Sequence, residues 1–171
     1  MSIRVPEITI HTHPIPSIHD PERVSSIHRG ELVHLALYFL DHFVDLSDIE
    51  RAVLRAFSLT GLDKGRWNIE RDYLRPLLNA LSLPQVRPWF EPGVRSLREV
   101  EVIDARGELH RIDRVVIGQQ TLEVVDFKLG QREEDHGAQV ALYKGFIETI
   151  FRRPTQGYLL YIDEPILVRV P

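Results

Sequence analysis

Two neighbouring β-strand patterns, each with one aspartate, constrain this chain more than any other feature. Segments 109–117 and 122–128 are rich in Val, Ile and Leu, as half-buried strands are, and a polar turn at 118–121 joins them. Asp113 and Asp126 stand where a plain core strand would carry an apolar residue. The pattern predicts a β-hairpin with one acid in each strand.

The turn length sets the pairing of these strands. A two-residue loop at 119–120 and a four-residue loop at 118–121 give the same antiparallel register. In that register Asp113 lies directly across from Asp126, with Cβ atoms roughly 4.5–5.5 Å apart on one face. Two carboxylates at that distance repel each other. A divalent cation would remove the repulsion, because hard cations take oxygen ligands.

Lys128 lies two residues beyond Asp126, so the period of two in a strand places it on the same face. The sequence therefore predicts two acids and an amine on one side of the sheet. A structural alternative stays open for each group. Asp113 would pair with Arg111 or Arg114, and Lys128 would end the sheet in water.

Composition narrows the class of protein. The 171 residues suit one domain, and 43% of them are hydrophobic and 27% charged. A formal net charge of −4 argues against nucleic-acid binding by bulk electrostatics but leaves room for a local basic groove. The absence of cysteine excludes disulfides, Fe–S clusters and thiolate zinc sites. With no apolar run of ~20 residues and no signal-peptide pattern, we expect a soluble cytoplasmic protein without membrane contact.

The first 24 residues are dense in proline, which disfavours a helix and predicts an extended arm or linker. A His-x-His pair there would be either a metal site or part of a solvated arm. The residues concerned are Pro6, Pro14, Pro16 and Pro21, and His11, His13 and His19. We expect residues 25–171 to form a single domain.

Residues 27–44 predict a buried helix that is apolar on most sides, with Ser25 or Ser26 as its N-cap. His34 lies in the middle of it. One interpretation is a core histidine satisfied by a hydrogen bond. The other is a metal ligand that reaches the acidic face of the sheet, because neutral imidazole is a common ligand.

Two further helices are predicted at 48–59 and 67–81, and both would cover the sheet. The first is expected to break at Thr60-Gly61 and the second to be interrupted near Pro76. The first strand is expected at 99–103. The turn that follows it sets Glu99 across from Asp113, where it would extend the acidic row. Alternatively, Glu99 is a surface acid beside Arg98.

After Lys128, the acidic residues 133–135 suit the N-terminal end of a helix that runs to about Phe151. Gln139 and Tyr143 lie one turn apart on it. They would contact a phosphate backbone or hold the helix to the sheet. Two more strand candidates follow at 157–162 and 166–170.

The order of these elements is that of an α+β fold, and five motifs resemble the nuclease domain of the RecB/AddA helicase–nucleases in the PD-(D/E)XK superfamily. The resemblance extends from about Arg29 to Tyr161. It implies a restriction-endonuclease-like αβββαβ core with extra N-terminal helices. The motifs are Gly30-Glu-Leu-Val33-His34, Glu99, Arg111-Ile-Asp113-Arg-Val-Val, Val125-Asp126-Phe-Lys128 and Gln139-x-x-x-Tyr143.

The resemblance also implies roles. His34, Asp113 and Asp126 would be metal ligands, together with the backbone carbonyl of Phe127. Lys128 would orient or activate the attacking water. The expected ion is Mg²⁺, for which Mn²⁺ would substitute.

Three further positions match with less specific roles. Glu99 corresponds to a recurring acidic position of the catalytic site. Gln139 and Tyr143 would support the site and the DNA strand. The sequence departs from the family pattern at His110, where glycine is usual, and at Leu129, where threonine often stands.

The resemblance implies a Mg²⁺-dependent deoxyribonuclease, exonucleolytic on DNA ends, and nucleoid-associated when acting. The chain has no G-x-x-x-x-G-K-[ST] phosphate loop and hence no helicase motor. We therefore expect the nuclease domain of a DNA-repair helicase–nuclease, or a stand-alone relative with a helicase partner. The alternatives are an inactive nuclease-like module that binds DNA or a helicase, and an RNA nuclease.

Overall fold

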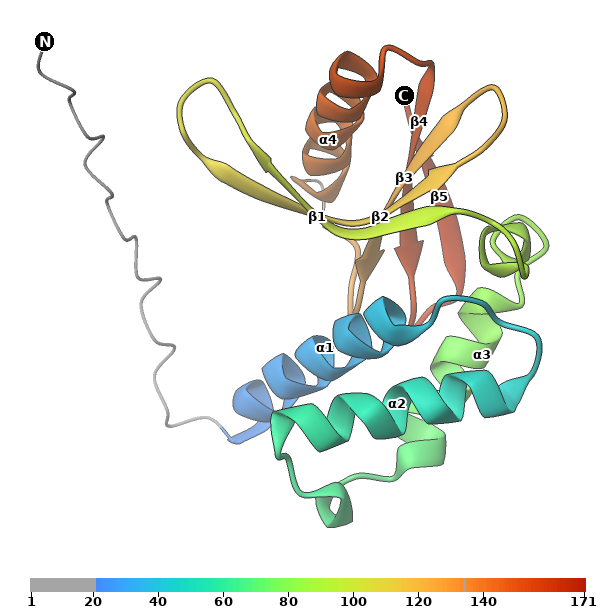
Figure 1. The fold of residues 1–171 in the computed structure, drawn as a ribbon. Coiled ribbons are helices and arrows are strands. Elements are labelled where there is room, and N and C mark those ends of the chain that lie inside the picture. Colours follow the sequence, from blue (N-terminus) through green and yellow to red (C-terminus); the bar gives the residue numbers. More distant parts are fainter. Residues whose placement is uncertain (1–20, 134) are drawn as a thin grey trace, which may run out of the picture.

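Helices make up the first half of the chain and strands most of the second, in a computed structural model that describes residues 21–133 and 135–171 (Figure 1). This order confirms the predicted α+β fold and the αβββαβ core with added N-terminal helices. The helical half comprises α1 (Pro21–Phe39), α2 (Leu46–Thr60), η1 (Lys64–Arg66), η2 (Glu70–Leu74), α3 (Arg75–Leu81) and η3 (Arg87–Phe90). The second half comprises β1 (Ser96–Ile103), β2 (Leu109–Ile117), β3 (Leu122–Lys128), α4 (Asp135–Phe151), β4 (Thr155–Tyr161) and β5 (Ile166–Val170).

A five-stranded sheet lies between two helical layers, with α4 on one face and α1 to α3 on the other (Figure 1). The strands lie in the order β1-β2-β3-β4-β5, and only β3 and β4 are parallel, joined through α4. The core is accordingly divided into two clusters. Val116 and Val125 pack with the helical half, whereas Val115 and Val124 pack under α4. This alternation follows from the period of two in a strand.

The start of α1 corrects the sequence-based boundary. The helix begins at Pro21, upstream of the predicted N-cap at Ser25 or Ser26. Proline is compatible with the first helical turn, because its missing N–H has no partner there anyway. The predicted arm therefore overlaps α1 at 21–24. The rest of it, residues 1–20 with His11, His13 and His19, lies outside the described residues, as does residue 134.

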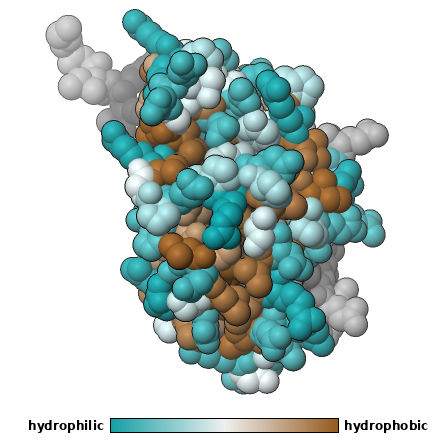
Figure 2. Space-filling model, turned by 90° about the vertical axis from the view of Figure 1, so that its right-hand side faces the viewer, coloured by the Kyte–Doolittle hydropathy of each residue, from teal (hydrophilic) through white to brown (hydrophobic). Residues whose placement is uncertain are grey.

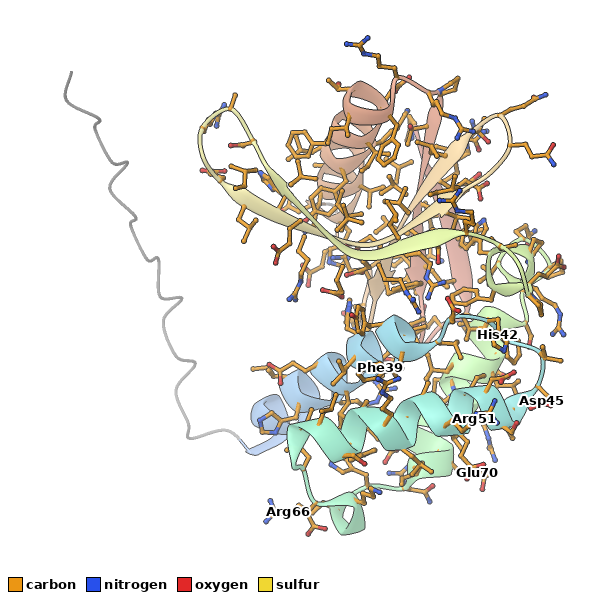
Figure 3. All side chains as sticks on the ribbon, viewed as in Figure 1. Phe39, His42, Asp45, Arg51, Arg66 and Glu70 are labelled. Atoms are coloured by element: carbon orange, nitrogen blue, oxygen red, sulfur yellow. The ribbon has the colours of Figure 1, made fainter. Side chains whose placement is uncertain are left out.

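The connection from α1 to α2 contains a well-formed helix cap (Figure 3). The Asp45 side chain accepts the N–H of Ser47 at 2.8 Å, and Asp48 accepts the N–H of Asp45 in return. At its other end α2 stops at Gly61, whose φ of 67° is left-handed. The predicted break at this glycine is confirmed. The predicted interruption near Pro76 is a π-helical turn, η2.

Both predicted hairpin registers are confirmed. Arg114 pairs with Val125 between β2 and β3, and Val100 pairs with Ile112 between β1 and β2. The pairing of β2 with β3 nevertheless ends at Arg114, one residue before the predicted contact of the two aspartates. The two carboxylates therefore do not face each other across paired strands. Instead, β2 and β3 separate at the position of the two aspartates.

The other ladder is interrupted as well. The pairing of β1 with β2 omits Glu99, although the register is the same on either side of it. Glu99 has a φ of 51°, in the left-handed region that strains a residue with a side chain. Such strain is typical of functional sites. Both irregularities lie around Asp113.

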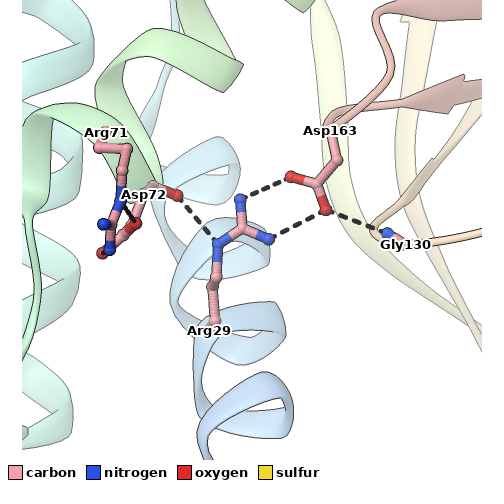
Figure 4. Close-up of polar contacts among 5 residues, drawn as sticks. All are labelled: Arg29, Arg71, Asp72, Gly130 and Asp163. Atoms are coloured by element: carbon pink, nitrogen blue, oxygen red, sulfur yellow. Dashed lines mark hydrogen bonds and ion pairs between the residues drawn. The ribbon is translucent and has the colours of Figure 1, made fainter.

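A bridge on the surface fixes the N-terminal half of α1 (Figure 4). Arg29 donates from Nε to the carbonyl of Asp72 at 2.9 Å and binds both carboxylate oxygens of Asp163 at 3.0 and 2.6 Å. Asp163 also accepts the N–H of Gly130 at 3.1 Å. Because Gly130 lies two residues after Lys128, this bridge ties α1 to the end of β3.

Within the described ranges, none of the helices combines the length and the apolar character that a membrane crossing requires. Hydrophobic side chains do reach the surface in patches on the face shown in Figure 2. The large ones that are exposed include Tyr38, Leu59, Ile103, Leu109, Leu142 and Ile150.

Candidate active site

A cavity of about 870 Å³ contains almost all of the side chains that the sequence singled out. Its walls come from α1, from the β1–β2 hairpin, from the end of β3 and from α4. The predicted site residues in its lining are His34, Glu99, Asp113, Asp126, Lys128, Gln139 and Tyr143. Phe127 is the exception, because its side chain is buried in the helical core.

Asp113 joins three elements. One oxygen, Oδ1, lies 3.3 Å from Nδ1 of His34 on α1. The other, Oδ2, accepts the N–H of Phe127 on β3 at 2.8 Å. Asp113 pairs with neither Arg111 nor Arg114, so the structural alternative for this residue is wrong. His34 is half-buried and faces the cavity rather than the core.

The acids around His34 change its protonation. Burial alone would lower the pKa of His34, but the hydrogen bond and charge of Asp113, with the charges of Asp126 and Glu99, raise it above its ordinary value. The imidazole is thus held in a strongly negative environment. Such an environment attracts protons and metal cations alike.

Glu99 belongs with His34 and Asp113 to a compact group of candidate metal ligands. Ligand atoms of His34, Glu99 and Asp113 all lie within 4.8 Å of one another. Burial raises the pKa of the Glu99 carboxyl, and the ion pair with Arg111 (2.7 Å) offsets this only in part. The alternative pairing with Arg98 is wrong.

Asp126 is turned toward Lys128. Its Oδ2 lies 2.8 Å from Nζ of Lys128, in an ion pair that is not aligned as a hydrogen bond. The ammonium group donates to Oε1 of Gln139 at 2.9 Å, and Nε2 of Gln139 donates to the hydroxyl of Tyr143 at 2.8 Å. Lys128 is therefore held inside the cavity by α4 and does not end the sheet in water.

The environment of Asp126 suits a cation. The residue is 3% exposed, and burial, with the charge of Asp113, raises its pKa to about 6 against the opposing effect of Lys128. One buried oxygen has no directed hydrogen bond. Asp126 does not belong to the group formed by His34, Glu99 and Asp113, but the charges of Asp113 and His34 act on it. A buried carboxylate in this state, close to a second acid and an imidazole, fits a divalent ion.

Arg114 is the residue whose function the sequence analysis missed. It is completely buried, and Nη2 donates to the carbonyls of Leu37 and Leu40 at 2.9 and 2.6 Å. Nη1 donates to Oγ of Ser96, and the guanidinium lies 4.3 Å from the ring centre of Phe90. Burial lowers the pKa of Arg114 to about 9. The available signal was a charged residue inside an apolar strand pattern.

These contacts explain where α1 ends and how His34 is placed. The carbonyls that Arg114 binds belong to Leu37, in the last turn of α1, and to Leu40, the residue directly after the helix. The helix ends at Phe39 and not at the predicted Val44. Because Arg114 follows Asp113 directly in β2, the strand holds the helix one turn beyond His34. The imidazole and the carboxylate are thereby fixed relative to each other.

A second group of acids and a histidine lies at the β1–β2 turn. Ligand atoms of Asp104, Glu108 and His110 also lie within 4.8 Å of one another. Oδ1 of Asp104 accepts the N–H groups of Arg106 and Glu108 at 2.8 and 2.9 Å, and Oδ2 lies 3.2 Å from Nε2 of His110. These bonds lower the pKa of Asp104. They are the bonds of a stable turn.

Comparison with known proteins identifies a family for this chain. The family model of the PD-(D/E)XK nuclease superfamily matches residues 11–168. Among solved structures, the crystal structure of SSO0001 is similar with a TM-score of 0.33 and 13% identity, over 86% of this chain and 76% of that one. No curated protein matches the chain.

Proposed function

Because the chain belongs to the PD-(D/E)XK nuclease superfamily, we propose that it is a divalent-metal-dependent deoxyribonuclease. Membership implies hydrolysis of phosphodiester bonds in a nucleic acid. The observation that carries the proposal is the grouping of His34, Glu99 and Asp113 in one cavity with the Asp126–Lys128 pair.

The acids and the imidazole would hold the ion. His34, Asp113 and Asp126 supply nitrogen and oxygen donors, Glu99 adds a third carboxylate, and the Phe127 carbonyl is the further ligand that the family resemblance implies. Mg²⁺ is the expected ion and Mn²⁺ its substitute. When bound, a divalent ion lowers the pKa of a coordinated water and neutralises charge on the phosphate oxygens.

The chain's own groups supply orientation. Lys128 carries a positive charge at a position that Asp126 and Gln139 fix, so its Nζ can orient the attacking water or donate to a phosphate oxygen. Tyr143 fixes the amide of Gln139 in turn. The N–H of Phe127 holds Asp113 in its orientation.

The more specific proposal is an exonuclease of the RecB/AddA type that acts on DNA ends. The support is the five sequence motifs, whose candidate site residues line one cavity apart from the buried Phe127. In this proposal residues 25–171 form the nuclease domain, in the cytoplasm, with a helicase motor or helicase subunit as partner.

Cleavage of labelled DNA tests the function. With Mg²⁺ or Mn²⁺ we expect linear DNA to be degraded from its ends and circular DNA to persist, and EDTA to stop the reaction. Asp126→Ala should abolish cleavage, whereas Glu101→Ala, an exposed acid of β1, should keep it. A cut in circular DNA would contradict the exonuclease. A failure of every divalent ion to support cleavage of DNA or of a competing RNA would contradict the nuclease and favour a binding module.

A further inference from the structure

Two exposed, largely apolar side chains line the same cavity as the acids. Tyr38 on α1 is 41% exposed, and Leu109, the first residue of β2, is 61% exposed. The two come from different elements, since Figure 1 shows α1 below the sheet and the β1–β2 hairpin at one edge of the sheet. A cavity that combines apolar surface with charged groups is suited to a ligand that has an apolar part.

Tyr38 is placed next to the proposed metal ligands. It lies four residues after His34, so both side chains project from one face of α1. The ring packs edge-on against Phe39, with ring centres 5.3 Å apart. The guanidinium of Arg98 lies 5.8 Å from the ring centre, while its Nη1 donates to the Tyr38 carbonyl at 3.1 Å. The ring is thus held in place before any ligand arrives.

Leu109 has an exposed partner. It pairs across the hairpin with Ile103, which is 70% exposed, so the two form an apolar ledge where the hairpin turns. Directly opposed residues of an antiparallel pair lie close together on one face. The ledge begins at the cavity, since Leu109 belongs to its lining.

Resting on the proposed nuclease function, we infer that Tyr38 and Leu109 form a nucleobase subsite beside the cleavage site. A base next to the scissile phosphate stacks on the Tyr38 ring and contacts Leu109, while its phosphate reaches the acids and Lys128. Aromatic rings bind every base through its π-face, so the subsite is tolerant of sequence. Stacking on the Tyr38 ring requires a free face of the base, which suits unpaired nucleotides rather than stacked base pairs.

Binding without cleavage tests the subsite directly. The probe is a single-stranded oligonucleotide that carries 2-aminopurine, with Ca²⁺ in place of Mg²⁺. We expect its fluorescence to be quenched by the protein, and Tyr38→Ala to weaken binding about tenfold. Tyr38→Phe should restore it. The control is Ile150→Ala, an exposed apolar residue of α4 outside the cavity lining, which should bind as the wild type does.

Cleavage with Mg²⁺ gives the second readout. For an oligonucleotide with an intact base at the cleaved position, Tyr38→Ala should raise KM about tenfold. For the same oligonucleotide with an abasic position there, Tyr38→Ala and the wild type should behave alike. Equal losses on both substrates would mean that Tyr38 acts through the position of His34, and would overturn the subsite.

The outcomes separate the two proposals. Quenching that depends on Tyr38, without cleavage under any divalent ion, would overturn the nuclease and leave the nucleobase subsite. Cleavage that does not depend on the ring, or equal affinity for the single strand and its duplex, would overturn the subsite and leave the nuclease.

Discussion

The described part of the chain contains two groups of two carboxylates and one histidine, and they behave in opposite ways. The cavity cluster consists of His34, Glu99 and Asp113, and the turn cluster of Asp104, Glu108 and His110. Each has its ligand atoms within 4.8 Å of one another. Composition and proximity therefore do not distinguish them.

The partners of the oxygens do distinguish them. In the turn cluster, backbone N–H groups satisfy Asp104 and lower its pKa. In the cavity, burial raises the pKa values of Glu99 and of the nearby Asp126, and one oxygen of Asp126 has no directed hydrogen bond. The first cluster is complete as it folds. In the second, burial still raises the pKa of Glu99 and of the neighbouring Asp126 although Arg111 and Lys128 lie beside them.

The largest difference should be in activity. Asp113→Asn should lower the cleavage rate by about 10³-fold or more, because it removes a proposed ligand and the partner of His34. Asp104→Asn keeps the acceptor oxygen that the turn needs and should cleave like the wild type. Initial rates on linear DNA with Mg²⁺ measure both. Similar rates for the two variants would erase the distinction between the clusters.

Metal should bind at only one of the two clusters, and its binding there should stabilise the folded protein. With Mn²⁺ at a hundred times its Kd, the wild type should gain about 2.7 kcal/mol of unfolding free energy. Glu99→Gln should lose much of this gain, while the matched change Glu108→Gln should keep it. Thermal unfolding with increasing Mn²⁺ gives the answer, and the idea fails if both variants respond alike.

Neutralising one acid in each region should shift stability in opposite directions when EDTA is present. At pH 8, Asp126→Asn should raise the free energy of unfolding by about 1–2 kcal/mol, because an ionised carboxylate in that position is unfavourable. Asp104→Asn should lower Tm, because the folded turn favours the ionised form. Urea unfolding of the two variants and the wild type measures whether each change raises or lowers the stability of the protein. A loss of stability in Asp126→Asn would contradict the comparison.

The smallest effect is the shape of the pH profile without metal. Asp126 and His34 have raised pKa values in the folded state, so folding takes up protons and stability falls as pH rises from about 4 through the folded pKa values. Asp104 has a lowered pKa, so its contribution is present above the ordinary pKa and is lost as pH falls through the folded one. Asp126→Asn should reduce the loss of stability as pH rises, and Asp104→Asn should reduce the loss of stability as pH falls into the acid range. Urea unfolding at each pH measures both changes.

Local features of this fold could be predicted from the sequence. The registers of both hairpins follow from turn length and from the period of two in a strand, and Arg114 does pair with Val125 as the turn at 118–121 requires. The presence of Gly61 predicted the end of α2, since it supplies the left-handed residue of the cap. Each of these signals lies within a few residues of what it determines.

Features that depend on distant residues could not be predicted. The end of α1 depends on Arg114, more than seventy positions later in the chain. The contact between His34 and Asp113 depends on how α1 packs on the sheet. The sequence named the candidate ligands, but their distances and their pKa values come from packing.

Because Asp113 and Arg114 are adjacent in the chain, they limit which insertions and deletions the sequence can tolerate during evolution. The acid meets His34 on α1, and the base binds the carbonyls at the end of the same helix. A shift of β2 by one residue in one direction would bring the carboxylate against the negative end of the helix, and a shift in the other direction would bring the guanidinium into the place of the cation. Selection should therefore remove insertions or deletions of a single codon in the turn at 118–121. Changes by two codons should be tolerated, because they keep Asp113 at His34 and Arg114 at the end of α1.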